Sequence, residues 1–248
     1  MRIVAVNGSP RGKRSNTDCI LQPFLSGARQ AGAETETVYL KDFKINYCLG
    51  CFTCWTKTPG KCIQKDDMPI LLEKMRGADI VIYATPLYIF TVSGLMKNFM
   101  DRFVMPFADP HILMRGEYYS HPSRYKEPKK NSSMRGIVLI SNCGFPGENN
   151  FSALVETFRV FTDVSGLKLR ATILRSMGEM FSVPGLESSF EWYFDAAKKA
   201  GREVVELGHV SPETQGILDK DLMAPEDYVT MANAYWDSEI AKAKKKKR

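Results

Sequence analysis

The chain has 248 residues, of which 44% are hydrophobic and 25% charged, and these proportions predict a globular domain with a full core. Its formal net charge is +6 at pH 7, but six positive charges crowd the C-terminal end (Lys242, Lys244–Lys247 and Arg248), so we expect no nucleic-acid partner. No apolar run is long enough to cross a membrane and the first ten residues lack a signal-peptide pattern, which predicts a cytoplasmic protein without a membrane partner.

The beginning of the chain predicts a loop that suits an anion. Residues 3–6 form an apolar, β-branched run typical of a buried strand, and Ser15 is a good N-cap for a helix whose apolar residues continue to Ala28. Backbone amides and the positive end of the helix dipole would meet in the loop between them. The loop has neither the Walker spacing nor the GxGxxG pattern, so a mononucleotide phosphate fits better; the alternative is a turn that is merely polar. The candidate phosphate ligands are Ser9, Arg11, Ser15, Asn16 and Thr17.

Strands and helices alternate along the rest of the chain. The patterns predict further strands at 34–40, 79–84, 137–141 and 169–174, and helices at 68–75, 95–103, 151–161, 190–207 and 226–240. Residues 105–133 are predicted to be irregular. Because parallel strands are joined by right-handed crossovers, we expect an α/β fold: a three-layer doubly wound sandwich with a five-stranded parallel sheet in the flavodoxin-like order 2-1-3-4-5.

Three loops would meet at the switch point of such a sheet, those after the first, third and fourth strands. Their sequences are NGSPR with SNT, TPLY with SGLMKNFMDR, and SNCGFPGE. Together, over residues 1–175, they resemble the flavodoxin-like NAD(P)H-dependent FMN reductase and iron-sulfur flavoprotein family. The resemblance implies FMN as cofactor, with its phosphate on the first loop, and NAD(P)H as co-substrate. It places the flavin ring against Pro86, Leu87, Tyr88, Ile89, Asn142, Cys143, Gly144 and Phe145. Taken alone, residues 86–88 would suggest only a turn at the end of a strand.

Four of the six cysteines lie within fifteen residues, with the spacing C-x2-C-x2-C-x7-C. In a cytosolic protein this pattern indicates metal binding or redox chemistry rather than disulfides. Zinc modules separate their cysteine pairs more widely, whereas three closely spaced thiolates and a fourth beyond a turn can enclose an iron–sulfur cluster. The resemblance implies a [4Fe-4S] cluster, and the alternatives are free or redox-active thiols and zinc. The candidate ligands are Cys48, Cys51, Cys54 and Cys62. Cys19 is predicted to lie in the core, and Cys143 to pack rather than react.

The resemblance implies an FMN-dependent oxidoreductase. It would take electrons from NAD(P)H or a protein donor and pass them to a quinone, a small electrophile or a one-electron partner such as a ferredoxin-like protein, through the cluster. Hydride transfer depends on how the nicotinamide and the flavin are positioned more than on proton transfer by a side chain, so no catalytic side chain is named. The alternatives are an electron-carrier iron-sulfur flavoprotein without its own substrate and a zinc-stabilised flavodoxin-like binding module.

We expect residues 1–210 to form the FMN-binding domain, with a cysteine loop at 46–66 and an insertion at 104–133. Residues 211–248 would form a helical extension with a basic tail. A flavin ring held only by loops stays half open, so a partner subunit is expected to cover it in a homodimer or homotetramer. The three histidines show no metal-ligand spacing. The tyrosines of the insertion would line a substrate pocket or a subunit contact: Tyr118, Tyr119 and Tyr125.

Overall fold

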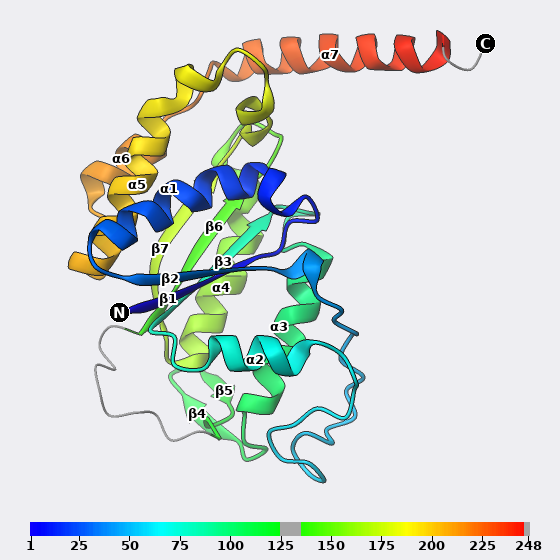
Figure 1. Cartoon of the computed structure of the whole chain (residues 1–248), viewed down its shortest axis with the longest axis vertical. Helices are drawn as coiled ribbons and strands as arrows, with labels where there is room; N and C mark the ends of the chain where they lie inside the picture. The colour runs from blue at the N-terminus through cyan, green and yellow to red at the C-terminus, as the bar shows by residue number, and fades with distance from the viewer. Residues whose placement is uncertain (125–134, 246–248) are drawn as a thin grey trace.

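The computed structural model describes residues 1–124 and 135–245, and its centre is a five-stranded parallel sheet in the order β2-β1-β3-β6-β7 (Figure 1). The strands are β1 (Arg2–Asn7), β2 (Glu34–Tyr39), β3 (Ile80–Pro86), β6 (Gly136–Asn142) and β7 (Lys168–Arg175). Because β6 and β7 are the fourth and fifth strands of this sheet along the chain, the predicted flavodoxin-like order is confirmed. The central strands β1, β3 and β6 are buried on both faces and therefore carry apolar side chains along most of their length, which makes them recognisable in the sequence.

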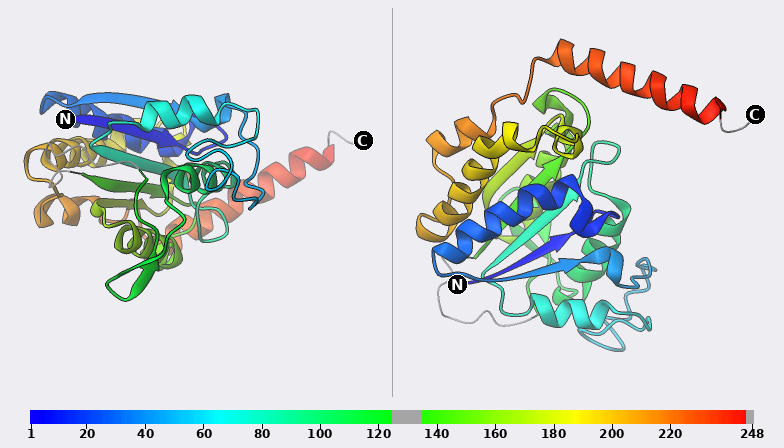
Figure 2. Two further views of the ribbon diagram at one scale, coloured as in Figure 1. Left: turned by 90° about the horizontal axis from the view of Figure 1, so that it is seen from below. Right: turned by 45° about the horizontal axis from the view of Figure 1, so that its top comes forward.

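Helices cover both faces of the sheet and make it a three-layer sandwich (Figures 1 and 2). Ile3 and Ala5 point toward one apolar core, and Val4 and Val6 toward the other, because side chains alternate along a strand. The first face carries α1 (Asn16–Gln30), α5 (Glu191–Glu206) and α6 (Pro212–Leu218). The second carries α2 (Met68–Met75), α3 (Gly94–Phe107) and α4 (Ser152–Ser165).

Helices α1 and α5 cross at two glycines. A Cβ atom on Gly27 would lie 1.7 Å from the Lys198 carbonyl oxygen, and one on Gly201 would lie 1.9 Å from the Phe24 carbonyl oxygen. This close crossing fixes α1, whose amino end follows the candidate phosphate loop. It also sets which face of α1 is inside: Cys19 lies on the exposed side, so the prediction that it belongs to the core is wrong.

The segment predicted to be irregular contains regular structure. A short antiparallel hairpin pairs β4 (Leu113–Arg115) with β5 (Tyr118–Ser120), so the prediction is wrong for these residues. The two-residue turn between the strands begins with Gly116 at φ +58°, and a glycine there is a recognised hairpin signal. Tyr118 accepts a hydrogen bond from Arg159 on α4, and Tyr119 is exposed. Tyr125 lies outside the described residues.

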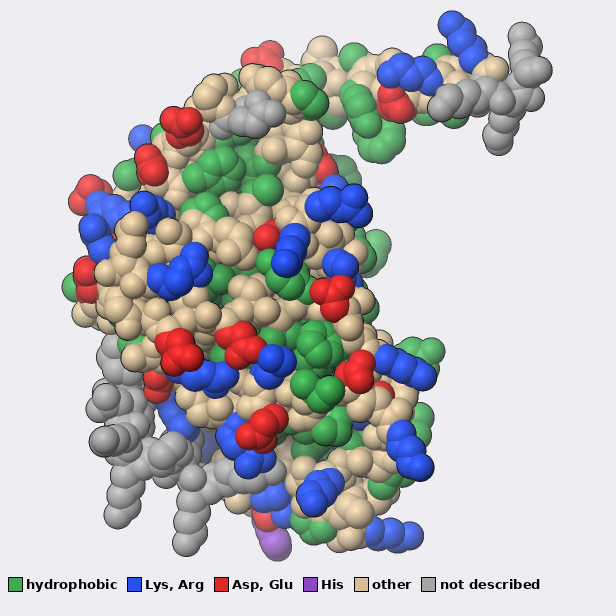
Figure 3. All heavy atoms as spheres, in the orientation of Figure 1, with side chains coloured by type: hydrophobic (Ala, Val, Ile, Leu, Met, Phe, Trp, Pro, Cys, Tyr) green, Lys and Arg blue, Asp and Glu red, His purple; other side chains and the backbone are tan. Residues whose placement is uncertain are grey.

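The C-terminal helix α7 (Pro225–Lys245) leaves the body of the molecule (Figure 1). Only its first turns pack against the fold, where Tyr228 is buried, and beyond them Trp236 is 59% exposed. Hydrophobic side chains protrude from the projecting part (Figure 3). None of the helices in the described ranges offers an apolar stretch long enough to span a bilayer. The last three residues of the basic tail lie outside the described ranges.

Candidate functional site

The loop after β1 is shaped by a chain of buried polar contacts. The Asn7 side chain accepts a hydrogen bond from the Ser9 amide at 2.9 Å and donates one to Asp18 at 3.1 Å. Ser15 caps α1: its hydroxyl accepts from the Asp18 amide at 3.1 Å and donates to the Gly12 carbonyl at 2.6 Å. The Ser15 hydroxyl is therefore engaged within the loop, where it fixes the start of α1.

Asp18 acts in this loop as a hydrogen-bond acceptor. Its carboxylate also accepts from Gln22 at 3.2 Å and from the Tyr39 hydroxyl at 3.3 Å. Burial raises the pKa of Asp18, although these hydrogen bonds and the one from Asn7 oppose the shift. Burial, followed by the charge of Asp18, raises the pKa of Tyr39 to about 12, so Tyr39 keeps its proton and donates it to the carboxylate. Asp18 thus orients the Asn7 side chain, and Asn7 in turn orients the loop after β1 through the Ser9 amide.

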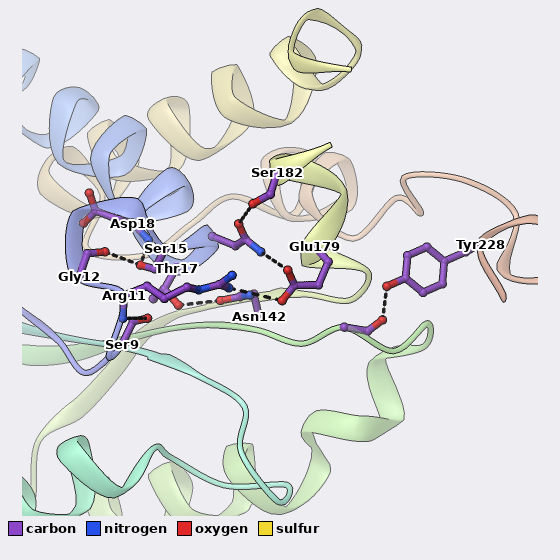
Figure 4. Close-up of polar contacts among 12 residues, drawn as sticks. Ser9, Arg11, Gly12, Ser15, Thr17, Asp18, Asn142, Glu179, Ser182 and Tyr228 are labelled. Carbon is purple, nitrogen blue, oxygen red and sulfur yellow. Dashed lines mark hydrogen bonds and ion pairs between the residues drawn. The ribbon is translucent and has the colours of Figure 1, made fainter. Parts of the chain in front are cut away.

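Hydrogen bonds join the three loops at the carboxyl edge of the sheet. The Thr17 hydroxyl donates to the Asn142 side chain at 2.7 Å, linking the loop after β1 to the end of β6 (Figure 4). The Ser93 hydroxyl donates to the Gly8 carbonyl at 2.6 Å, and the Leu87 amide donates to the Asn142 carbonyl at 2.9 Å. The expected meeting of these loops at the switch point is present in the structure.

The groups that could hold an anion gather at the start of α1. The first amides of a helix have no acceptor within it, so those of Asn16 and Thr17 point out of the helix end. Arg11 and Asn16 already contact a carboxylate: Glu179 lies 3.4 Å from the Arg11 guanidinium and accepts from the Asn16 side chain at 3.0 Å (Figure 4). Ser9 is buried beside them, and its hydroxyl accepts from the Arg11 amide at 3.3 Å. This donor set fits a phosphate.

The turn after β3 carries apolar side chains on a strained backbone. Pro86 is buried at the end of the strand, and Leu87 is half-buried. Ile89 and Phe90 both have positive φ, +48° and +61°, which is rare for a β-branched or bulky residue. Two backbone hydrogen bonds between Tyr88 and Thr91 close the turn, and Ile89 is 89% exposed. Strain of this kind concentrates at functional sites, so the exposed apolar tip suits a flat ring.

The loop after β6 is held from the C-terminal side. The Cys143 amide donates to the Arg175 carbonyl, and the Gly144 carbonyl accepts from the hydroxyl of Tyr228 at the start of α7. Burial raises the pKa of the Cys143 thiol, in agreement with a packing role, while Phe145 is exposed. Sequence reasoning named neither Tyr228 nor Glu179. No local pattern marks them, since each lies far along the chain from the loop that it contacts.

The cysteine loop is fastened at its base. Arg102 on α3 donates to the Asp66 carboxylate at 2.7 and 3.1 Å and to the Asn46 carbonyl at 2.8 Å. The side chains of this ion pair are 2% and 0% exposed. Further out, the Trp55 indole donates to the Met105 carbonyl and packs against His121, with ring centroids 4.6 Å apart and ring planes inclined at 57°. The insertion after α3 therefore supports the cysteine loop.

The four loop thiols lie near one another without converging. Burial raises the pKa of Cys54, and the neighbouring charges of Cys62, Cys48 and Cys51 raise it further. Within residues 1–124 and 135–245, no three cysteine, histidine or acidic side chains converge on a point that would hold a metal ion. Four thiols on one loop fit a [4Fe-4S] cluster in number and type, and binding it would require the loop to draw them together.

In protein freed of any bound metal by a chelator, we expect Cys51 to be alkylated by iodoacetamide about tenfold faster than Cys143 at pH 7. Cys51 is exposed, and hydrogen bonds from the Thr53 hydroxyl and amide lower its pKa below the ordinary 9.0, so more of it is thiolate. The pH of half-maximal labelling should lie below 9.0 for Cys51 and above it for Cys143. Time-resolved peptide mass spectrometry measures both, with urea-unfolded protein as the control. Equal rates in the folded protein would contradict the prediction.

A doubly wound parallel sheet whose loops after β1, β3 and β6 meet at the first turn of α1 defines a flavodoxin-like fold. Residues 1–118 match the family described as NADPH-dependent FMN reductase. The family resemblance stated from the three loop motifs is confirmed.

Curated proteins that are similar in sequence to this chain include iron-sulfur flavoproteins. One from Archaeoglobus fulgidus is 40% identical over 118 residues, which are 48% of this chain and 51% of that protein. One from Methanocaldococcus jannaschii is 38% identical over 102 residues, 41% of this chain and 51% of that protein. The chain thus spans about half the length of these relatives. A putative NAD(P)H-dependent FMN-containing oxidoreductase of Bacillus subtilis is 24% identical over 180 residues, 70% of this chain and 84% of that protein.

Solved structures share the fold at low sequence identity. An FMN-dependent NADH-azoreductase from Bacillus anthracis has a TM-score of 0.59 at 12% identity and covers 83% of this chain and 100% of its own. An NAD(P)H:quinone oxidoreductase from Methanothermobacter marburgensis has a TM-score of 0.57 at 19% identity, and the match covers 82% of this chain and 98% of that protein. At these identities the likeness establishes the fold.

Proposed function

We propose that the protein is an FMN-dependent oxidoreductase that takes electrons from NAD(P)H. The observation that carries this proposal is the joining of three loops at one sheet edge, with Arg11 and Asn16 already holding an anionic group. The phosphate ligands would be Ser9, Arg11, Asn16 and Thr17 with the amides of the first turn of α1. When bound, FMN supplies hydride and single-electron chemistry.

The protein's own residues would bind and orient the cofactor rather than move protons. The turn at 86–91 offers apolar contacts to one face of the ring, and residues 142–145 offer backbone groups to its polar edge. Asp18 is fully engaged by its hydrogen-bond donors, and the Cys143 thiol is held in its neutral form by burial. Neither side chain is therefore needed as an acid or base, since hydride transfer depends on placement.

An apolar groove supports a quinone or another small electrophile as the electron acceptor. It measures about 380 Å³ and lies between the turn after β3 and the cysteine loop, with Thr91 and Cys48 in its lining. Met100 and Val104 of α3 and Phe161 of α4 make its walls apolar. Such walls suit a flat aromatic ligand near both candidate redox sites.

We also propose that the cysteine loop binds a [4Fe-4S] cluster through Cys48, Cys51, Cys54 and Cys62. The support is the donor set, the fastened loop base and the iron-sulfur flavoproteins among the relatives. A ferredoxin-like partner would then be a one-electron donor or acceptor. Iron and acid-labile sulfide content, with broad brown absorption that dithionite bleaches, tests the cluster. Cys54→Ala should remove both signals and leave flavin binding intact.

We propose further that residues 1–210 form the FMN-binding unit and that the chain assembles as a homodimer or homotetramer. Helix α7 supports a subunit contact, because Tyr235, Trp236 and Ile240 expose apolar surface on a helix without neighbours over most of its described length. A long helix in water gains its stability from packing of its apolar face. Sedimentation equilibrium over a concentration range tests the assembly, and a monomer throughout would contradict it.

The decisive experiment is anaerobic purification followed by rapid mixing with NADH or NADPH. We expect a yellow protein whose flavin is released on denaturation and whose flavin absorbance bleaches with one of the two nucleotides. Reduction by a protein donor alone would instead support the electron-carrier alternative. Colourless protein that takes up no flavin and contains one zinc ion per chain would support the zinc-stabilised module.

A further inference from the structure

Glu179 occupies the place where a phosphate is expected. It belongs to the short helical turn Gly178–Ser182 that follows β7, and Figure 4 shows its side chain directed at the loop after β1. One carboxylate oxygen lies 3.4 Å from the Arg11 guanidinium, and the other accepts from the Asn16 side chain at 3.0 Å. Both partners are candidate ligands of the FMN phosphate. An anionic side chain of the protein therefore holds donors that the cofactor needs.

The backbone around Glu179 aims the side chain at this place. Met177 adopts a left-handed conformation with φ +55°, and its amide donates to the Phe145 carbonyl at 3.1 Å. The Gly178 amide donates to the Cys143 carbonyl at 2.8 Å. On the other side of Glu179, the Ser182 hydroxyl donates to the Asn16 side chain at 2.5 Å. The turn Gly178–Ser182 is thus bonded to the loop after β6 on one side of Glu179 and to the start of α1 on the other.

We propose that Glu179 is an internal counter-anion of the phosphate site, which must release Arg11 and Asn16 before FMN can bind fully. Two anions cannot share these donors without repulsion, so the carboxylate weakens phosphate binding. The inference rests on the proposed FMN-dependent function and adds a determinant of cofactor affinity to it. Because the Arg11 pair is about half exposed, the effect is moderate.

The test compares Glu179→Gln with the unaltered full-length chain, both freed of flavin. Glutamine has the same shape and can still accept from Asn16, but it carries no charge. We expect the dissociation constant for FMN to fall about three- to fivefold, as loss of a partly exposed charge interaction predicts. Riboflavin lacks the phosphate, so its dissociation constant should stay unchanged. Quenching of flavin fluorescence measures both constants.

Glu34→Gln is the matched control, because it removes the same charge at the exposed amino end of β2. It should change neither constant. Weaker FMN binding by Glu179→Gln, or equal shifts for FMN and riboflavin, would overturn the proposal while leaving FMN binding established. If neither protein binds any flavin, the proposed function fails and this inference fails with it.

Discussion

Replacing Arg102 with methionine is expected to lower the free energy of unfolding by about 3–5 kcal/mol, because the buried Asp66 carboxylate would lose its counter-ion. The side chains of Arg102 and Asp66 are almost completely buried, and both terminal guanidinium nitrogens, Nη1 and Nη2, contact the carboxylate. The substitution also removes the bond from Arg102 to the Asn46 carbonyl. Both ends of the cysteine loop lose their fastening, so protease sensitivity within residues 46–66 should rise together with the loss of stability.

Lys97→Met is the matched control on the same helix. Lys97 and Asp101 form an exposed ion pair one helical turn apart, and such pairs contribute at most about 1 kcal/mol. Urea unfolding followed by circular dichroism gives both free energies, and limited proteolysis reports on the loop. Equal losses for the two variants would contradict the assignment of Arg102 and Asp66 as the fastening of the loop.

The effect of Arg102→Met should depend on pH in a defined direction. Burial alone would raise the pKa of Asp66, but hydrogen bonds from Arg102 and from the Asn46 and Met68 amides lower it below the ordinary 3.8. A carboxyl group with a depressed pKa stabilises the fold above its unfolded pKa and loses that contribution as the pH falls through its folded pKa. The difference in free energy of unfolding between the unaltered protein and Arg102→Met should therefore narrow below about pH 4.

The sheet and its switch point were predictable because the signal is local. Each central strand is a short run of β-branched and apolar residues buried on both faces, and the order follows from the crossover rule. The helix phase of Cys19 was misjudged since one cysteine carries little information about which side faces the core. The hairpin at 113–120 was missed because each of its strands has only three residues, which is too short for an alternating pattern to show.

The parts of the site that depend on contacts between residues far apart in the chain could not be predicted from the sequence. Motif reasoning found the loops that carry Arg11 and Asn142, but Glu179 lies 168 residues from Arg11 and Tyr228 lies 84 residues from Gly144. Likewise, the cysteines were evident, whereas the Arg102–Asp66 pair that fastens their loop spans 36 residues. Such partners are chosen by the fold, since only tertiary packing brings them within bonding distance.

Replacing Thr17 with valine is expected to raise the dissociation constant for FMN about tenfold, because the Thr17 hydroxyl would exchange its bond to the neutral Asn142 side chain for a stronger one to the charged phosphate. Thr17 is buried, and its hydroxyl joins the loop after β1 to Asn142 at the ring edge, next to the site expected for the phosphate. Valine keeps the shape and removes the donor, so the packing of α1 should survive.

Thr162→Val is the matched control for this change. It removes an equally buried hydroxyl whose bonds run only to carbonyls of its own helix α4, those of Phe158 and Arg159. Fluorescence titration should show unchanged FMN affinity for this variant, and thermal unfolding should confirm that both variants fold. Because the Thr17 hydroxyl lies at the phosphate end, the loss of affinity should be larger for FMN than for riboflavin. FMN affinity in Thr17→Val equal to that of the control would mean that the joined loops do not bind the phosphate at this point, and the cofactor would then have to lie elsewhere on the sheet edge.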